Sequence, residues 1–392
     1  VVAQRARQLL DLGVVKRETH VELGDLVLLD RVDGQAAPDL DERGDVLAHG
    51  HAQHAADPHD GQQLVAHLHH RQREREHEQA HLLLRRAARG AGRHFVARGH
   101  PGPQGRARAA PVDPQLQDQL RQRLEHALEQ LANAGGRVSV CVTDLDRGKD
   151  LVLGDAFITL PVAQLGVVPL LIQVSAAIEA GKLDAAASVA RPPTADGGSA
   201  GLWRHLAAAD LNPGDLAVLT AAAADPLATN ALIDLVGLDP VRERIDQLGL
   251  TRTALLDRVR EDRGPDDAPH FALSTTRDLT TMFSSLANGR AVSAAVSAQV
   301  TGWLALNADL GLAAGATGLD PLAHAETAEQ LLLVNKTGRD PGIRAEAGVL
   351  VGPRAGVAYA MIVQFTEETP LDRLRVHDAF RVFGADLMES VH

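Results

Sequence analysis

The chain has 392 residues, of which 45% are hydrophobic and 3% aromatic, and its formal net charge is -12 at pH 7. This acidic balance argues against a general nucleic-acid-binding protein, which needs a basic face toward the phosphates. The single cysteine, Cys141, excludes an intrachain disulfide framework, and no apolar run approaches the roughly 20 residues that a transmembrane helix needs.

Residues 1–112 form a histidine- and arginine-rich N-terminal stretch with one aromatic residue, Phe95. Its apolar patches are short and isolated, so we expect a low-order extension that cannot offset the entropy of ordering the chain. A metal-binding role is the alternative, but the histidine spacings match no ligand set beyond His-x-His, and we predict neither a metal nor a cofactor. A third interpretation is a mis-assigned start of translation. For that reason the lack of a secretory-signal pattern leaves the cellular location unknown.

Regular structure is predicted from residue 113 onward. Asp113 and Pro114 suit the start of a helix, and Gly135-Gly136 suits its end. Leucines recur at helical spacing between them, at Leu116, Leu120, Leu124, Leu128 and Leu131. Residues 138–142 alternate like a strand and residues 150–153 return after a turn, which predicts a β-hairpin.

The rest of the chain changes from helical to strand patterns. Residues 163–180 are apolar on nearly all sides, which predicts a buried helix. Residues 195–325 read as mainly helical, and strands are predicted over 331–337, 345–351 and 356–365, followed by a closing amphipathic helix. This order predicts an α/β (α+β) sandwich in which the first and last segments share one sheet.

One predicted strand carries a motif, Asn335-Lys336-Thr337-Gly338. In this position it resembles the Lys-Thr-Gly motif of the penicillin-recognising serine hydrolases, the class A β-lactamases and penicillin-binding proteins. The resemblance extends over residues 113–392. It implies a mainly antiparallel sheet flanked by helices, formed by residues 113–162 and 328–392, with an inserted all-helical subdomain over residues 163–327.

The segment from Leu160 to Leu171 is similar to the start of the family's nucleophile helix, Ala-Ser-x-x-Lys. In that register Gln164 occupies the serine position and Val167 the lysine position. None of the four lysines in the chain has a serine three residues before it. The serine-lysine pair that the family uses is therefore missing.

Two further segments resemble the family but depart from it at reactive positions. In Ala224-Asp225-Pro226, Ala224 and Pro226 replace the serine and asparagine of the family's Ser-Asp-Asn. Residues 256–264 keep Leu-Asp-Arg, yet Arg260 stands where the family has its glutamate, and Glu261 comes one position late. Glu261 is the one residual candidate for a catalytic carboxylate in this loop.

Acyl transfer needs a hydroxyl nucleophile activated by an adjacent base. Gln164 offers an amide, Val167 cannot carry a proton, and losing members of a catalytic unit costs many decades in rate. We therefore predict a catalytically inactive protein with a ligand-binding or scaffolding role. The resemblance implies that Lys336, Thr337 and Gly338 face a ligand, that the ligand is small and anionic or peptidoglycan-like, and that the protein is exported or associated with the cell envelope.

The alternative is an active serine-type hydrolase acting on β-lactams or a related peptidoglycan-type substrate with non-standard catalytic residues, in which Thr159 or Ser199 would supply the hydroxyl. Another option is a hydrolase that uses Glu261 or Asp225 with water on a non-lactam substrate. Other cations that could line the same cleft are Arg204, Arg260 and Arg344. We expect the aromatic residues Trp203, Trp303 and Tyr359 to lie in the core.

Overall fold

The computed structural model describes residues 114–392, except for 149, 193–199, 325–330 and 367–368. The extension predicted over residues 1–112 lies outside this part. A five-stranded antiparallel sheet has the strand order β2-β1-β10-β9-β8. Its strands are β1 (Arg137–Asp144), β2 (Asp150–Gly154), β8 (Leu332–Asp340), β9 (Ile343–Val351) and β10 (Gly356–Gln364). The predicted hairpin and the three late strands are confirmed, and β1 pairs with β10 so that Cys141 lies opposite Ala360.

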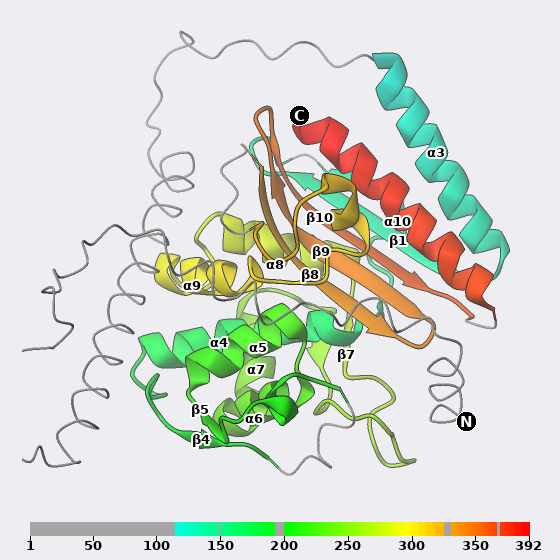
Figure 1. Ribbon diagram of the computed structural model, residues 1–392. Coiled ribbons are helices and arrows are strands. Elements are labelled where there is room, and N and C mark those ends of the chain that lie inside the picture. Colours follow the sequence, from blue (N-terminus) through cyan, green and yellow to red (C-terminus); the bar gives the residue numbers. More distant parts are fainter. Residues whose placement is uncertain (1–113, 149, 193–199, 325–330, 367–368) are drawn as a thin grey trace, which may run out of the picture. The chain divides into compact units, whose positions relative to one another are not determined.

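Helices cover both faces of the sheet, as Figure 1 shows. Helices α3 (Pro114–Asn133) and α10 (Pro370–Val391) pack together on one face, and α8 (Thr276–Ala287) lies on the other. Side chains alternate along β10 because successive residues of a strand point to opposite faces. Tyr359 and Met361 belong to the apolar cluster between the sheet and α10. Ala360 and Ile362 belong to the larger cluster on the opposite face of the sheet, which includes residues of α8.

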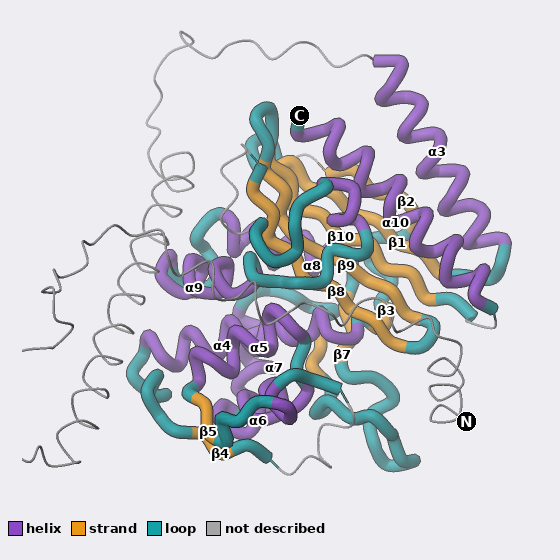
Figure 2. Tube along the Cα trace, in the orientation of Figure 1, coloured by secondary structure: helices purple, strands orange, loops and turns teal. Residues whose placement is uncertain are grey.

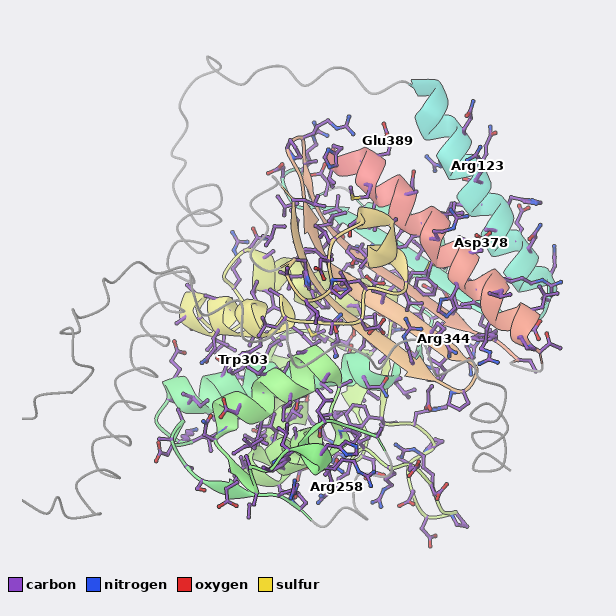
Figure 3. All side chains as sticks on the ribbon, in the orientation of Figure 1. Arg123, Arg258, Trp303, Arg344, Asp378 and Glu389 are labelled. Atoms are coloured by element: carbon purple, nitrogen blue, oxygen red, sulfur yellow. The ribbon has the colours of Figure 1, made fainter. Side chains whose placement is uncertain are left out.

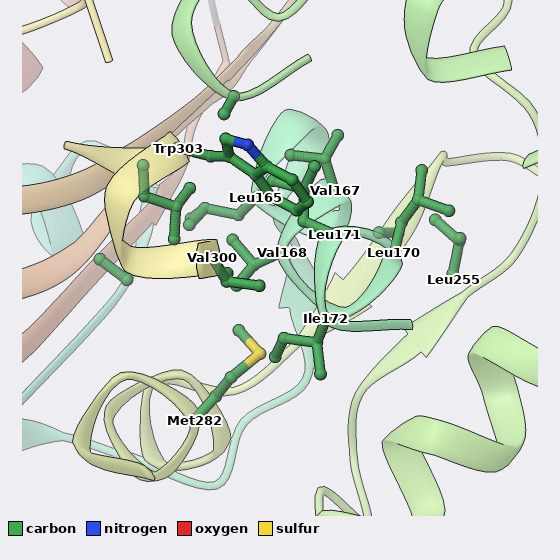
Figure 4. Close-up of a cluster of buried hydrophobic side chains, with 14 of the residues drawn as sticks. Leu165, Val167, Val168, Leu170, Leu171, Ile172, Leu255, Met282, Val300 and Trp303 are labelled. Carbon is green, nitrogen blue, oxygen red and sulfur yellow. The ribbon is translucent and has the colours of Figure 1, made fainter. Parts of the chain in front are cut away.

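The second part of the described chain is mainly helical (Figure 2). It contains α4 (Val167–Glu179), α5 (Pro213–Ala223), α6 (Pro226–Val236), α7 (Leu238–Gln247) and α9 (Ala294–Leu304). Helix α4 is buried along most of its length, as predicted, and Figure 4 shows the apolar side chains around it. Its α-helical part begins at Val167, because the four residues before it form a 3-10 turn, η2 (Ala163–Gly166).

Short elements complete the fold. One small sheet has the order β3-β7-β6 and another pairs β4 with β5, so the inserted part is not purely helical. These strands are β3 (Leu160–Pro161), β4 (Val189–Ala190), β5 (Asp210–Leu211), β6 (Ala254–Leu255) and β7 (Ala272–Ser274). Two further 3-10 turns are η4 (Trp203–His205) and η5 (Ala313–Thr317).

Side-chain caps fix where several helices begin. Thr369 accepts a hydrogen bond from the Asp372 N–H, and the Asp372 carboxylate accepts one from the Thr369 N–H, which makes a capping box at the start of α10. Asn212 and Thr275 cap α5 and α8 in the simpler way, each accepting one backbone N–H. Within the described part of the chain, no helix combines the length and the apolarity that crossing a membrane requires.

Candidate active-site region

The 3-10 turn η2 lies directly against the edge strand β8. The contact is so close that a Cβ atom added to Gly338 would lie 2.0 Å from the Val162 carbonyl oxygen. Only glycine fits there. Ala163, next in the chain, has a φ of 46°, a left-handed conformation that costs a non-glycine residue on the order of 1–2 kcal/mol. Strained backbone of this kind is concentrated at functional sites, which makes the η2–β8 junction the place to look for one.

The side chain that η2 presents to β8 is Gln164. Its Oε1 atom accepts a hydrogen bond of 2.8 Å from the backbone N–H of Arg339, the residue after Gly338. A backbone N–H at such a junction is the kind of donor that stabilises developing negative charge on an oxygen. Here that donor is already engaged by a neutral amide.

Val167, three residues further, begins α4 and is 1% exposed. It belongs to the same apolar cluster as Leu165, Leu171 and Trp303 (Figure 4). A charged or titrating group in this environment would lose its hydration without gaining a partner. Both tryptophans lie in this core, as predicted, with Trp203 fully buried.

The link between α5 and α6 holds Ala224, Asp225 and Pro226. Ala224 ends α5 in the left-handed conformation, with a φ of 51°, and Pro226 is the first residue of α6. The Asp225 carboxylate accepts the N–H groups of Leu202 at 2.6 Å, Trp203 at 2.8 Å and Ala228 at 3.0 Å. Asp225 therefore caps α6 and fastens η4 to it, and its oxygens are directed at the backbone.

Lys336 points from β8 into the helical part and is 1% exposed. Its Nζ donates a hydrogen bond of 2.7 Å to the carbonyl oxygen of Ala221 in α5. Burial lowers the pKa of the Lys336 ammonium to about 8, and the nearby Asp309 carboxylate opposes this change. The ammonium therefore ties the edge strand to the helices.

Thr337 and Arg339 hold a carboxylate from within the chain. Asp309 Oδ2 accepts a hydrogen bond of 2.7 Å from the Thr337 hydroxyl and one of 2.6 Å from Arg339 Nε. A second guanidinium nitrogen of Arg339 reaches Asp309 Oδ1 at 2.9 Å, so the pair is bidentate. Burial tends to raise the pKa of Asp309, but the donors from Arg339 and Thr337 bring it below the usual value.

The loop that carries Arg260 and Glu261 is held in place by Asn230 and Asp257. The Asn230 amide accepts the Val259 N–H at 2.8 Å and donates to the Val259 carbonyl at 3.0 Å. Arg260 pairs with Asp257, and Glu261 is exposed.

The remaining candidates from the sequence are dispersed. Arg344 donates to the Asp340 and Ile343 carbonyls at the β8–β9 turn and lies on the sheet in Figure 3. Thr159 is exposed, Arg204 lies in η4, and Ser199 is outside the described residues. No group of three or more His, Cys, Asp or Glu residues in the described ranges could hold a metal ion, and the histidine-rich N-terminal stretch is not among them.

The sequence did not reveal a buried polar network that runs behind the edge strand. Asn307 donates to Asn335 Oδ1 at 3.0 Å, and Asn335 donates to Glu346 Oε1 at 2.9 Å. The same Glu346 oxygen accepts the Tyr359 hydroxyl at 2.7 Å and the Ala314 N–H at 3.1 Å. Because Glu346 is fully buried, its pKa is raised to about 7 in spite of these donors. In the sequence, the signal for this network is Glu346 itself, a charged residue within an otherwise apolar strand pattern.

The sheet, its helical insertion and the turn packed on the edge strand together have the architecture of the penicillin-recognising serine hydrolases. Residues 119–391, well over half of the chain, match the model of a family described as the beta-lactamase enzyme family. The chain therefore belongs to the beta-lactamase enzyme family, a family of serine hydrolases.

Solved structures agree with this fold. The beta-lactamase from Sphaerobacter thermophilus matches with a TM-score of 0.58 and 22% identity, over 67% of this chain and 95% of that one. PBP-A matches with a TM-score of 0.57 and 17% identity, over 69% and 96% of the two chains. A beta lactamase from Xanthomonas campestris matches with a TM-score of 0.57 and 18% identity, over 70% and 98%. No curated protein gives a significant match.

Proposed function

We propose that this protein is a catalytically inactive member of the beta-lactamase enzyme family that binds a ligand or partner without cleaving it. The observation that carries the proposal is the position of Gln164. Its amide oxygen takes up the Arg339 N–H at the η2–β8 junction, where the family resemblance places the nucleophilic serine. The chain thus fills that position with a group that has no useful nucleophilicity.

The other positions that the family resemblance marks as reactive offer no replacement for the missing chemistry. Val167 is buried among apolar side chains and cannot take a proton. Ala224 has no hydroxyl, and Pro226 has neither a side-chain donor nor a backbone N–H. The alternative hypothesis uses the Asp225 carboxylate to activate water. That carboxylate already accepts hydrogen bonds from three backbone N–H groups. These contacts support binding without turnover.

The proposed ligand is small and anionic or peptidoglycan-like, and the proposed location is the cell envelope. The support is family membership together with a cationic edge strand. Lys336, Thr337 and Gly338 remain the proposed ligand-facing residues. Lys336 and Thr337 are at present bonded to Ala221 and Asp309, so a ligand would have to exchange with these contacts.

The test uses the full chain with a chromogenic β-lactam and a fluorescent penicillin. We expect no turnover, and no fluorescent band on a denaturing gel beyond that of a heat-unfolded sample, which measures nonspecific acylation of surface groups. Turnover, or a band specific to the folded protein, would refute the proposal. In that case Glu261→Gln and Thr159→Ala variants would show which group performs the reaction.

A further inference from the structure

Residues 305–317, from the end of α9 to the end of η5, pass over the edge of the sheet on the side that α10 covers. We call this segment the strap. We propose that Glu346 on β9 is a proton-dependent latch, which holds the strap on the sheet while it is protonated and lets the strap open more often once it is ionised. This inference goes beyond the proposed function and applies whether or not the protein cleaves a substrate.

The strap is hydrogen-bonded to the sheet through polar side chains. Among the described residues, no backbone–backbone hydrogen bond links the strap to a strand of the five-stranded sheet. Instead, Asn307 donates to Asn335 on β8 at 3.0 Å, and the Asp309 carboxylate accepts hydrogen bonds from two further residues of that strand. The backbone N–H of Ala314 donates to Glu346 at 3.1 Å. The attachment of the strap therefore depends on a few side chains, one of which is a carboxyl group that titrates.

Two of these attachments lead to Glu346. Its Oε1 atom accepts hydrogen bonds from the Ala314 N–H of η5, from the Asn335 amide of β8 at 2.9 Å and from the Tyr359 hydroxyl of β10 at 2.7 Å. Asn335 in turn accepts the hydrogen bond from Asn307 of the strap. Because the Glu346 side chain is 0% exposed, water does not screen the effect of its charge on either attachment.

The surroundings of Glu346 favour its protonated form. Burial and the Asp309 carboxylate of the strap raise its pKa, neutral donors from Tyr359, Asn335 and Ala314 lower it, and the result is about 7. Opening the strap admits water to the carboxyl, and its pKa then returns toward 4.5. Raising the pH from 4.5 to about 7 therefore favours the open strap, because the open form releases the proton first.

The charged groups on the neighbouring elements are bonded elsewhere. On β8, Lys336 points into the helical part and Arg339 pairs with the aspartate of the strap. On β9 itself, Arg344 donates to backbone carbonyls at the β8–β9 turn. On α10, burial and the two arginines lower the pKa of His377 from 6.5, against a hydrogen bond to the strap backbone. His377 is thus a second titrating group at the strap, and it titrates at lower pH than Glu346.

The strap has fewer backbone attachments than the strands beneath it. β10 is paired with β1 on one side and with β9 on the other. Within the described ranges, and apart from its continuation of α9, the strap forms one backbone–backbone hydrogen bond to another element, from Ala308 to Ala222 of α5. Segments with few such bonds open locally at a lower free energy than paired core strands. We therefore expect the strap to open while the sheet stays folded.

Amide hydrogen exchange of the full chain tests the latch. Mass spectrometry compares strap and β10 peptides at pH 6 and 8, after correction for the intrinsic pH dependence of exchange. The strap should exchange faster than β10, and its opening equilibrium constant should rise about tenfold between these pH values. Glu346→Gln should abolish the rise. His377→Gln and the exposed control Glu243→Gln should keep it.

Tyr359 supplies a second test that a purely structural role of Glu346 would not pass. Its hydroxyl lowers the pKa of Glu346, so Tyr359→Phe should extend the rise in strap exchange to higher pH. The chain has one tyrosine, whose own pKa is raised well above 10, so its ultraviolet Raman bands in the wild type should change with a midpoint near pH 7. The proposal is overturned if the strap exchanges no faster than β10, if its opening is independent of pH, or if the tyrosine bands stay constant from pH 5 to 9.

Discussion

Replacing Glu346 with glutamine should change how the stability of this protein depends on pH. The Glu346 carboxyl is fully buried, and its pKa is raised from 4.5 to about 7. Below pH 4.5 it is protonated in both the folded and the unfolded chain, so its stabilising contribution is fully present. As the pH rises, the unfolded chain releases the proton first, and this contribution is lost by the time the pH has passed through about 7.

The size of the effect follows from the two pKa values. A pH unit corresponds to about 1.4 kcal/mol, so the interval from 4.5 to about 7 corresponds to a loss of about 3 kcal/mol in the free energy of unfolding. Glutamine has no proton to lose. Its oxygen can accept the same hydrogen bonds from Tyr359, Asn335 and Ala314 as Oε1 does. Its NH₂ group takes the place of Oε2 and loses only the 3.3 Å contact of that atom with the Ala314 N–H, which already bonds to Oε1.

The assay is urea unfolding of the wild type and Glu346→Gln between pH 4.5 and 8. We expect the variant to match the wild type at the acid end and to exceed it by about 3 kcal/mol at the alkaline end. Glu243→Gln, an exposed change on α7, is the control and should leave the difference flat. Parallel stability curves for the wild type and Glu346→Gln would refute the reasoning, because they would mean that Glu346 titrates alike in both states.

Two substitutions, one at the η2–β8 junction and one in the apolar core at the start of α4, test the packing. Gly338→Ala should lower the free energy of unfolding by at least about 2 kcal/mol, because the new methyl group would collide with the Val162 main chain. Gly264→Ala is the control. Its methyl group would contact only the Asp267 side chain, at 3.5 Å, and the change should cost less than about 1 kcal/mol. Val167→Lys should cost about 3–5 kcal/mol by burying an unpaired charge, whereas the exposed Val292→Lys should cost little. Urea unfolding measures both pairs. Equal losses within either pair would contradict the close contact of Gly338 with Val162 or the burial of Val167 in the apolar core.

Most of the fold could be predicted because local patterns encode it. The leucine spacing identified α3, the alternation identified β1, and the apolar runs identified the three late strands, all of which the structure confirms. Tyr359 was expected in the core and is buried there. Its hydrogen bond to Glu346 was not foreseeable, because the two residues meet only through the pairing of β9 with β10.

The contacts of the candidate site could not be predicted for a similar reason. Gln164 meets Arg339 across 175 positions of sequence, and Asp309 meets Thr337 and Arg339 across 28 and 30. The segment around Asp309 has neither helical nor strand periodicity to mark it. Motif spacing identifies Gln164 and Lys336 as candidates. Their partners, Arg339 and Ala221, lie on other elements that only the tertiary packing brings next to them.

The pairing of β1 with β10 also sets an order of assembly during synthesis. β1 (Arg137–Asp144) can form its hairpin with β2 as soon as both have left the ribosome, but its other neighbour, β10 (Gly356–Gln364), is made more than 200 residues later. Until then one edge of β1 keeps unpaired N–H and C=O groups beside apolar side chains, the combination that promotes aggregation in nascent chains. The central sheet can therefore close only after the helical insertion has been translated, and such non-local pairing makes for slow folding.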